Sequence, residues 1–181
     1  MVALSTQNHL VDVVIPAFNA ARYIHQTLES IVLQGNLVHS IIVVNDGSVD
    51  LTAKCVEAFA KQHPDLEIKL ISQANAGLAN ARNTGIKAAT APFIALLDAD
   101  DIWLKGKLER QLEVFNTSLD PQLGVVYAGY ELIDENSLLM TNGKGLIKPQ
   151  ARGDVRSKLL TGNFISGSGS NVLIKSEVFK E

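Results

Sequence analysis

The chain has 181 residues, of which 46% are hydrophobic and 19% are charged, a balance that suits one globular domain and excludes a disordered chain. Sixteen Lys and Arg residues against nineteen Asp and Glu residues give a formal net charge of −3. No basic cluster could track a phosphate backbone, which excludes nucleic acid as the expected partner. The single cysteine excludes an intrachain disulfide and is usual for a cytoplasmic protein.

The first two thirds of the chain alternate short apolar runs with repeats of helical period. In chain order, the pattern predicts strand 11–15, helix 20–34, strand 40–44, a helix after residue 50, strand 66–71, helix 76–89 weakened by Gly85, strand 93–97 and a helix with Leu104, Leu108, Leu112 and Phe115 on one face. Pro16 is expected to end the first strand, and Asn19 to cap the first helix. Ser48 or Asp50 is expected to cap the second helix.

The last third has a weaker pattern. It predicts a strand over 124–130, a turn or excursion from the sheet over 134–150, a short helix over 154–160 and a strand over 171–175. Ser176 is expected to cap a further helix, and because the sequence stops one turn into it at Glu181, we expect a truncated domain. Strands that alternate with helices favour an α/β fold, with a mostly parallel sheet covered by helices on both faces.

Polar residues follow each of the four strands predicted in the first two thirds of the chain. The strand ends carry residues 16–19 (PAFN), 45–48 (NDGS), 73–75 (QAN) and 98–101 (DADD). In open α/β sheets, ligands bind outside the carboxyl ends of the strands. The sequence therefore predicts one ligand-binding edge built from all four strand ends.

The last of these ends places three carboxylates within four residues, Asp98, Asp100 and Asp101. Because side chains alternate along a strand, Asp98 and Asp100 are expected to point the same way. Carboxylates this close raise one another's pKa or require a cation, and Mg²⁺ or Mn²⁺ is the natural hard cation for oxygen ligands. A diphosphate would complete its coordination. The alternative is a solvated turn in which Asp101 caps the next helix.

Four ordered motifs resemble those of family 2 inverting glycosyltransferases with the GT-A fold. The matching segments are VVIPAFN (13–19), IVVNDGS (42–48), NAG (75–77) with ARNTG (81–85), and LDADD (97–101). The resemblance covers residues 11–115, and residues 168–174 are a weaker match. It implies one domain over residues 1–181, with nucleotide-sugar binding in 11–115 and an incomplete acceptor part in 116–181.

The resemblance also implies a set of donor-binding residues: Pro16, Ala17, Phe18, Asn19, Asp46, Gly77, Arg82, Asp98, Ala99 and Asp100. Phe18 and Asn19 would line the base pocket, and Asp46 would accept a hydrogen bond from the base, usually uracil. Arg82 would face the diphosphate or brace the acidic motif. Asp100 would be the main ligand of Mn²⁺ or Mg²⁺, with Asp98 beside it.

Each of these residues also has a purely structural interpretation. Phe18 could be a core residue and Asn19 only a helix cap. Asp46 could be a turn former beside Gly47, and Arg82 a surface ion pair worth about 0–1 kcal/mol.

The implied reaction moves a sugar, with inversion, from a nucleotide-diphosphate donor such as a UDP-sugar to a glycan or lipid-linked acceptor. It needs a carboxylate base that accepts the acceptor hydroxyl's proton, and we expect that base beyond residue 181. The resemblance suggests bacterial polysaccharide synthesis in the cytoplasm, with possible contact to the inner face of the membrane through a missing C-terminal region. The sequence itself has no signal peptide pattern and no apolar run near the roughly 20 residues that cross a bilayer.

Three other classes of protein compete with this interpretation. A binding module could keep the donor fold without turnover. A phosphatase with an aspartate nucleophile is a weaker candidate, because Ile102 stands where a threonine is required. A dinucleotide-binding dehydrogenase is excluded, because no glycine fingerprint follows the first strand.

Overall fold

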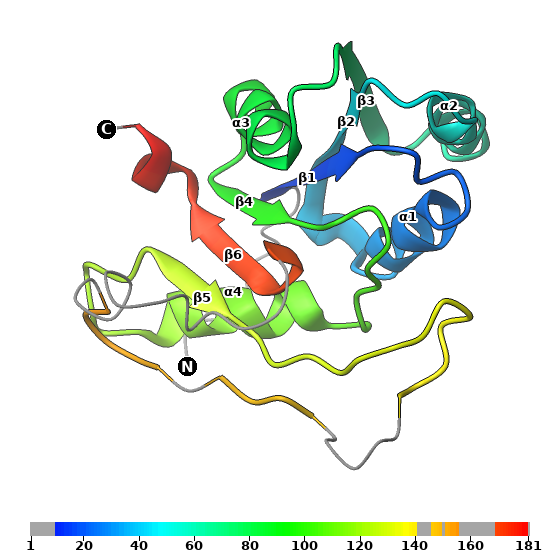
Figure 1. The fold of residues 1–181 in the computed structure, drawn as a ribbon. Coiled ribbons are helices and arrows are strands. Elements are labelled where there is room, and N and C mark those ends of the chain that lie inside the picture. Colours follow the sequence, from blue (N-terminus) through cyan, green and yellow to red (C-terminus); the bar gives the residue numbers. More distant parts are fainter. Residues whose placement is uncertain (1–9, 141–145, 150, 156–168, 181) are drawn as a thin grey trace.

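The central feature of the fold is a mixed sheet with helices on both faces (Figure 1). The structure is a computed structural model that describes residues 10–140, 146–149, 151–155 and 169–180. Within them the sheet has six strands in the order β3-β2-β1-β4-β6-β5. They are β1 (Val11–Ala17), β2 (Val38–Asp46), β3 (Glu67–Gln73), β4 (Phe93–Leu96), β5 (Val125–Tyr127) and β6 (Val172–Lys175). The strands β1 to β4 are parallel to one another, and β6 is antiparallel to both of its neighbours.

Two hydrophobic clusters separate the faces of the sheet. Val13 and Ile15 of β1 pack with residues of α1 (Ile24–Val32), α2 (Thr52–Gln62) and α4 (Lys107–Thr117), whereas Val14 packs with α3 (Leu78–Ala88). Since successive side chains of a strand point to opposite faces, α3 covers one face and the other three helices cover the second. The predicted α/β fold with a mostly parallel, doubly covered sheet is confirmed.

The start of the chain departs from the predicted boundaries. The strand β1 continues through Pro16 to Ala17. The neighbouring strand β4 ends opposite Val14, so beyond Val14 the strand β1 is paired only with β2. The N–H that Pro16 lacks is therefore not needed for a hydrogen bond to β4. Asn19 does not cap a helix. It adopts φ +50°, its side chain accepts a hydrogen bond from the Val49 N–H at 2.9 Å, and α1 begins only at Ile24.

The loop after β1 is held instead by the loop after β2. The Ala20 N–H donates to Thr52 Oγ1 at 2.8 Å, and the Ala21 N–H donates to Asp50 Oδ2 at 3.0 Å. Of the two predicted caps of the second helix, Asp50 accepts the Thr52 N–H at 2.9 Å, and Ser48 accepts the Asn19 N–H. The two strand ends therefore form one connected edge.

Other differences lie toward the carboxyl end. Leu104 precedes α4 and is 77% exposed, so its predicted place on the buried helix face is wrong, whereas Leu108 and Leu112 are buried. Residues 176–179 form a 3₁₀ turn, not an α-helix. The helix predicted over 154–160 falls largely outside the described residues.

The segment after β5 leaves the sheet, as predicted, and passes below α1 in Figure 1. Tyr130 pairs with Ile147 at its base, and the Arg22 side chain donates to the Glu135 carbonyl near its tip.

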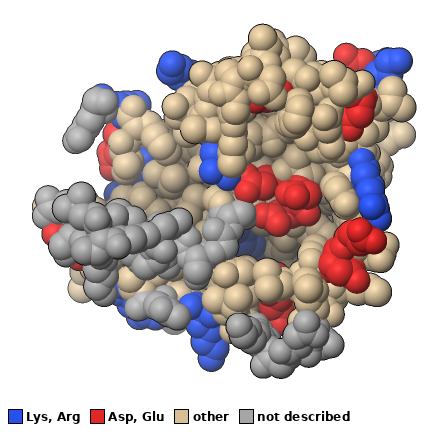
Figure 2. All heavy atoms as spheres, in the orientation of Figure 1, with Lys and Arg blue, Asp and Glu red and all other residues tan. Residues whose placement is uncertain are grey.

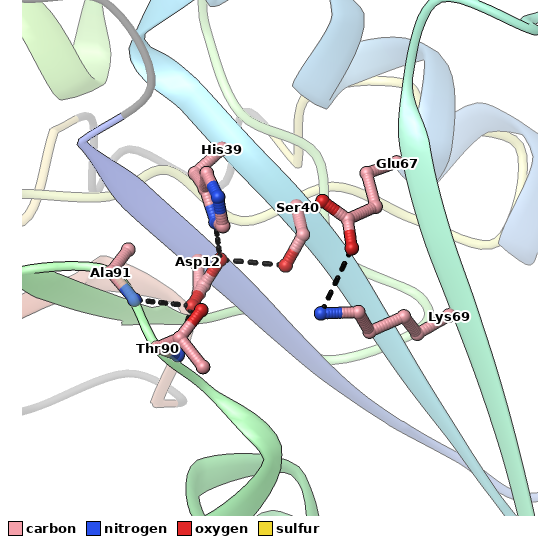
Figure 3. A network of polar contacts seen from close by, with 7 residues as sticks. All are labelled: Asp12, His39, Ser40, Glu67, Lys69, Thr90 and Ala91. Atoms are coloured by element: carbon pink, nitrogen blue, oxygen red, sulfur yellow. Dashed lines mark hydrogen bonds and ion pairs between the residues drawn. The ribbon is translucent and has the colours of Figure 1, made fainter.

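Asp12 is a fully buried carboxylate at the amino end of β1, opposite the predicted ligand-binding edge (Figure 3). It accepts hydrogen bonds from Ser40 Oγ at 2.6 Å and from the Thr90 and Ala91 N–H groups at 2.6 and 2.7 Å, and His39 Nδ1 lies 2.8 Å away. Burial alone would raise the pKa of Asp12, but these donors outweigh it and hold the pKa below its usual value. Asp12 therefore ties β1 and β2 to the segment that leads into β4.

No helix in the described ranges has both the length and the apolar character needed to span a membrane.

Candidate functional site

A hollow of about 200 Å³ lies at the carboxyl ends of β1 and β2. It is lined by Pro16, Ala17, Phe18, Asp46, Asn75, Gly77, Leu78 and Ala81. The structure thus brings together the residues that the sequence assigned to the base pocket, Asn19 excepted. Phe18 is 54% exposed, so its interpretation as a core residue is wrong. We call this hollow the first hollow.

Asp46 is the polar centre of the first hollow. Its Oδ1 accepts hydrogen bonds from Gln73 Nε2 at 2.7 Å and from the Ala76 N–H at 2.9 Å, and its Oδ2 accepts the Gly77 N–H at 2.9 Å. The Gln73 amide, followed by the Ala76 N–H, holds the pKa of Asp46 below its usual value, against partial desolvation that acts in the opposite direction. Asp46 is therefore ionised at neutral pH and can only accept hydrogen bonds.

A second hollow of about 320 Å³ adjoins the first. Its lining is Pro16, Phe18, Asn19, Ala20, Tyr23, Leu78, Asp98, Ala99 and Asp100. Pro16, Phe18 and Leu78 line both hollows, so the two form a continuous depression along the edge of the sheet. Figure 2 shows acidic atoms gathered near the middle of the face that it draws, with basic atoms beside them.

The acidic loop, residues 98–101, is held by a serine far away in the sequence. Ser170 Oγ accepts the Asp98 N–H at 2.8 Å and donates to Asp101 Oδ2 at 2.6 Å. Trp103 Nε1 donates to the Ser170 carbonyl at 2.7 Å, and Thr27 Oγ1 donates to the Ala99 carbonyl at 2.9 Å. Asp101 does not cap α4, which begins six residues later at Lys107, so this part of the alternative is wrong, although the Asp101 N–H donates to the Asp98 carbonyl at 3.1 Å in a turn.

Arg82, on α3, reaches the acidic loop from the opposite side. Its Nη2 donates to Asp98 Oδ1 at 2.6 Å, and the two side chains are only 23% and 19% exposed. Gly169 packs against the guanidinium, where a Cβ would lie 3.0 Å from Nη2. Among the residues that the structure describes, the buried Arg82 Nε has no hydrogen-bond partner. The guanidinium thus braces Asp98.

Asp100 is the acidic side chain most open to solvent in this loop. Partial desolvation, then the charges of Asp101 and Asp98, raise the pKa of Asp100 above its usual value. No group of three or more His, Cys, Asp or Glu side chains in the described ranges is arranged to hold a metal ion. Asp98 and Asp101 already bind Arg82 and Ser170.

This arrangement does not fit a preformed cage for a metal ion. It does fit a Mg²⁺ or Mn²⁺ ion of the kind that is bound by one or two carboxylates together with substrate phosphates.

The sequence did not single out several residues that shape these hollows. Gln73 stands at a predicted strand end, but nothing in its local pattern links it to Asp46. Ser170 follows Asp98 by 72 residues in the sequence, and Ala99 follows Thr27 by the same number. Such contacts have no local spacing that a sequence pattern could show.

Comparisons with known proteins agree with this architecture. The family model described as glycosyl transferase family 2 matches residues 12–181. The chain is 36% identical over 133 residues to WfgD of Escherichia coli, named as a UDP-Glc:alpha-D-GlcNAc-diphosphoundecaprenol beta-1,3-glucosyltransferase, covering 73% of this chain and 50% of that protein. It is 40% identical over 126 residues to an uncharacterised glycosyltransferase of Nostoc, covering 70% of this chain and 38% of that protein. The chain thus spans half or less of the length of these relatives.

Solved structures of glycosyltransferases also resemble this chain. The mannosyltransferase PcManGT from Pyrobaculum calidifontis, solved in complex with GDP-Man and Mn²⁺, is 30% identical with a TM-score of 0.61, covering 68% of this chain and 36% of that one. Residues 1–349 of S. aureus TarS, in complex with UDP-GlcNAc, are 22% identical with a TM-score of 0.71, covering 94% of this chain and 46% of that one. These matches show that the chain belongs to glycosyl transferase family 2, with its sheet and helices arranged as a GT-A fold.

Proposed function

We propose that this chain is the donor-binding part of a glycosyltransferase. Its donor would be a UDP-sugar, from which the enzyme transfers the sugar to an acceptor. The observation that carries the proposal is the continuous depression formed by the two hollows. One contains an ionised carboxylate that accepts hydrogen bonds, and the other contains the acidic loop with Arg82 beside it. A nucleotide requires this arrangement, with a hydrogen-bond acceptor for the base in one hollow and carboxylates for a metal-bound diphosphate in the next.

The base would occupy the first hollow. Phe18 would flank it, and Asp46 would accept a hydrogen bond from uracil, while Asn19, which lines the adjoining second hollow, would stand beside the base. Pro16, Ala17 and Gly77 would form the apolar wall. The WfgD name specifies a UDP-sugar donor, which supports uracil, whereas PcManGT was solved with GDP-Man, so the base itself needs a direct test.

The diphosphate would lie in the second hollow beside Asp98, Ala99 and Asp100. Asp100 would be the main ligand of Mn²⁺ or Mg²⁺, and Asp98 would stand beside it, held by Arg82, whose guanidinium would face the diphosphate. The ion, when bound, would neutralise charge on the departing nucleoside diphosphate. The Mn²⁺ bound by PcManGT supports this assignment.

The acceptor would be a glycan or a lipid-linked saccharide, as the lipid diphosphate acceptor in the WfgD name suggests. Inverting transfer would require a base that removes the acceptor's proton. Asp46, Asp98 and Asp100 are the acidic residues that line the two hollows, and each already has a donor-binding role in this proposal. We therefore assign no catalytic base within the described part of the chain.

Isothermal titration calorimetry with UDP tests the proposal. We expect UDP to bind in Mn²⁺ or Mg²⁺ and to lose affinity about tenfold or more in EDTA, and the Asp100→Asn variant to lose the metal-dependent part. Asp65→Asn is the matched control, because Asp65 is exposed at the amino end of β3, away from both hollows. Equal affinity with and without metal would reject the metal assignment. Tighter binding of GDP would reject uracil, and no binding of either nucleotide would reject the proposed function.

A further inference from the structure

We propose that Gln73 is a positioning residue of the first hollow, which fixes the Asp46 carboxylate and so sets a preference for UDP over CDP. The inference rests on the proposed function and adds a determinant of base selection to it. Gln73 is the last residue of β3, and its Cα is paired with that of Asp46 at the end of the ladder between β2 and β3. The two side chains therefore leave adjacent strands at the same level.

Every polar atom of the Gln73 amide has a partner. Its Nε2 donates to Asp46 Oδ1 at 2.7 Å and to Asn80 Oδ1 at 3.0 Å, and its Oε1 accepts the Thr84 hydroxyl at 2.8 Å. Both partners other than Asp46 lie on α3, one helical turn apart. Because two of the three bonds come from a rigid helix, the amide cannot turn without breaking them.

The direction of the amide follows from the chemistry of Asp46. An ionised carboxylate has no hydrogen to donate, so only the amide nitrogen can face it favourably. A flipped amide would place its oxygen against Asp46 Oδ1, and it would leave the Thr84 hydroxyl facing the NH₂ group. The Gln73 hydrogen bond is also the largest single cause of the lowered pKa of Asp46.

The bonds from the protein leave little freedom for this carboxylate. Oδ1 receives two donors, from Gln73 and Ala76, and Oδ2 receives one, from Gly77. A carboxylate offers about four acceptor positions, so about one remains for a ligand in the hollow. A fixed acceptor at this point suits a base that presents a ring N–H.

Uracil and cytosine differ at this ring position. Uracil carries an N–H at N3, whereas cytosine has an unprotonated nitrogen there and an amino group beside it. A carboxylate held in place would meet the cytosine lone pair and be repelled. A carboxylate freed from Gln73 could turn toward the amino group and accept from it. Sites with fixed polar partners reject analogues that lack the matching group. By fixing the Asp46 carboxylate, Gln73 therefore makes the hollow prefer uracil to cytosine.

The test compares the affinities for UDP and CDP in Mn²⁺ by calorimetry, on the 181-residue chain and its variants. Gln73→Met keeps the length of the side chain and removes both donors. We expect UDP affinity to fall about tenfold and CDP affinity to fall less, so that the ratio between them moves toward one. Gln62→Met, an exposed position at the end of α2, is the matched control and should change neither affinity.

The pH profile gives a second readout that a loss of packing would not produce. Without the Gln73 donor, the pKa of Asp46 rises, so UDP binding should be lost at a higher pH in Gln73→Met than in the parent chain as the pH falls. Thr84→Val keeps the donor to Asp46 but frees one end of the amide, and we expect a smaller drop in the ratio of UDP to CDP affinity. It decides the question if Gln73→Met does not fold.

An unchanged ratio and pH profile in Gln73→Met would overturn the inference while leaving the proposed function standing, because the parent chain would still bind UDP. If Gln73→Met does not fold, an unchanged ratio in Thr84→Val overturns it. If the parent chain binds neither UDP nor CDP, the proposed function fails and this inference fails with it.

Discussion

Replacing Gly85 with Ala is expected to destabilise the fold, although Ala is the better helix former. Gly85 lies within α3, and a Cβ there would meet Val14 Cγ1 at 2.3 Å and Val14 Cγ2 and Val44 Cγ2 at 3.3 Å. Carbon atoms in contact prefer about 3.5–4.0 Å, so helix and sheet would have to separate by about 1 Å. Val14 and Val44 are fully buried in central strands and have nowhere to move.

Two effects of opposite sign decide the result. The gain in helix propensity from Gly to Ala is about 1 kcal/mol. Overpacking of a buried contact costs about 1–3 kcal/mol, and a separation of 2.3 Å belongs at the upper end of that range. The expected net loss is about 2 kcal/mol in the free energy of unfolding. Because α3 also carries Ala81 and Arg82, its displacement should weaken UDP binding as well.

Urea unfolding followed by circular dichroism measures the loss, as a lower midpoint at an unchanged slope. Asn83→Ala is the control for helix propensity, since Asn83 is exposed on the same helix, and it should be neutral or slightly stabilising. Combining Gly85→Ala with Val14→Ala removes the clashing methyl groups, so the double variant should be more stable than the sum of the single effects predicts. A Gly85→Ala chain as stable as the parent would refute the close-packing argument.

Three further outcomes are expected. Asp12→Asn turns an NH₂ group toward a backbone donor of Thr90 or Ala91, which should cost about 1–3 kcal/mol at pH 7. The folded pKa of Asp12 lies below its unfolded value near 3.9, so its contribution is full above that value and lost as the pH falls through the folded pKa. Urea midpoints of variant and parent should therefore converge as the pH falls below about 3.9 and through the lower folded pKa, and a gap that does not depend on pH would contradict this. Gly77→Ala places a Cβ with no atom within 4 Å, but its φ of +86° should cost about 1–3 kcal/mol in thermal unfolding, and no loss of stability would show that the backbone adapts. Ser170→Ala removes the hydroxyl that joins Asp98 to Asp101, and calorimetry should show weaker Mn²⁺-dependent UDP binding with unchanged uridine binding. A parallel loss of both would mean that Ser170 supports the whole edge.

Local pattern was enough to predict the sheet and the edge that carries the site. Continuous apolar runs such as residues 41–44 predict strands buried on both faces, and they lie at the centre of the sheet. Because parallel strands end at one edge, the polar residues after β1, β2 and β4 had to meet there. The same reasoning predicts that Phe18, Asp46 and Asp100 share one edge, and these residues line the two adjoining hollows.

The errors arose where a distant segment replaced a local partner. Asn19 has the side chain of a helix cap, but Val49 offers it a backbone N–H from the neighbouring loop, and the helix starts later. Gly85 was interpreted as a weak point of a helix, whereas its missing side chain lets α3 approach Val14. Neither partner can be read from the spacing around the residue, because both contacts depend on how strands pack side by side.

The aspartates of this chain show what separates a structural carboxylate from one that can bind a ligand. Asp12 and Asp46 both lie on buried strands, Asp12 between two valines and Asp46 between Asn45 and Gly47. Asp12 has four partners within the protein, and the fold needs nothing more from it. Asp46 has three and faces a hollow, and Asp100 is exposed with a pKa raised by partial desolvation and by its acidic neighbours. An incomplete set of donors at an accessible edge marks the carboxylate that a base or a cation can complete, which is why Asp46 and Asp100, and not Asp12, carry the proposed function.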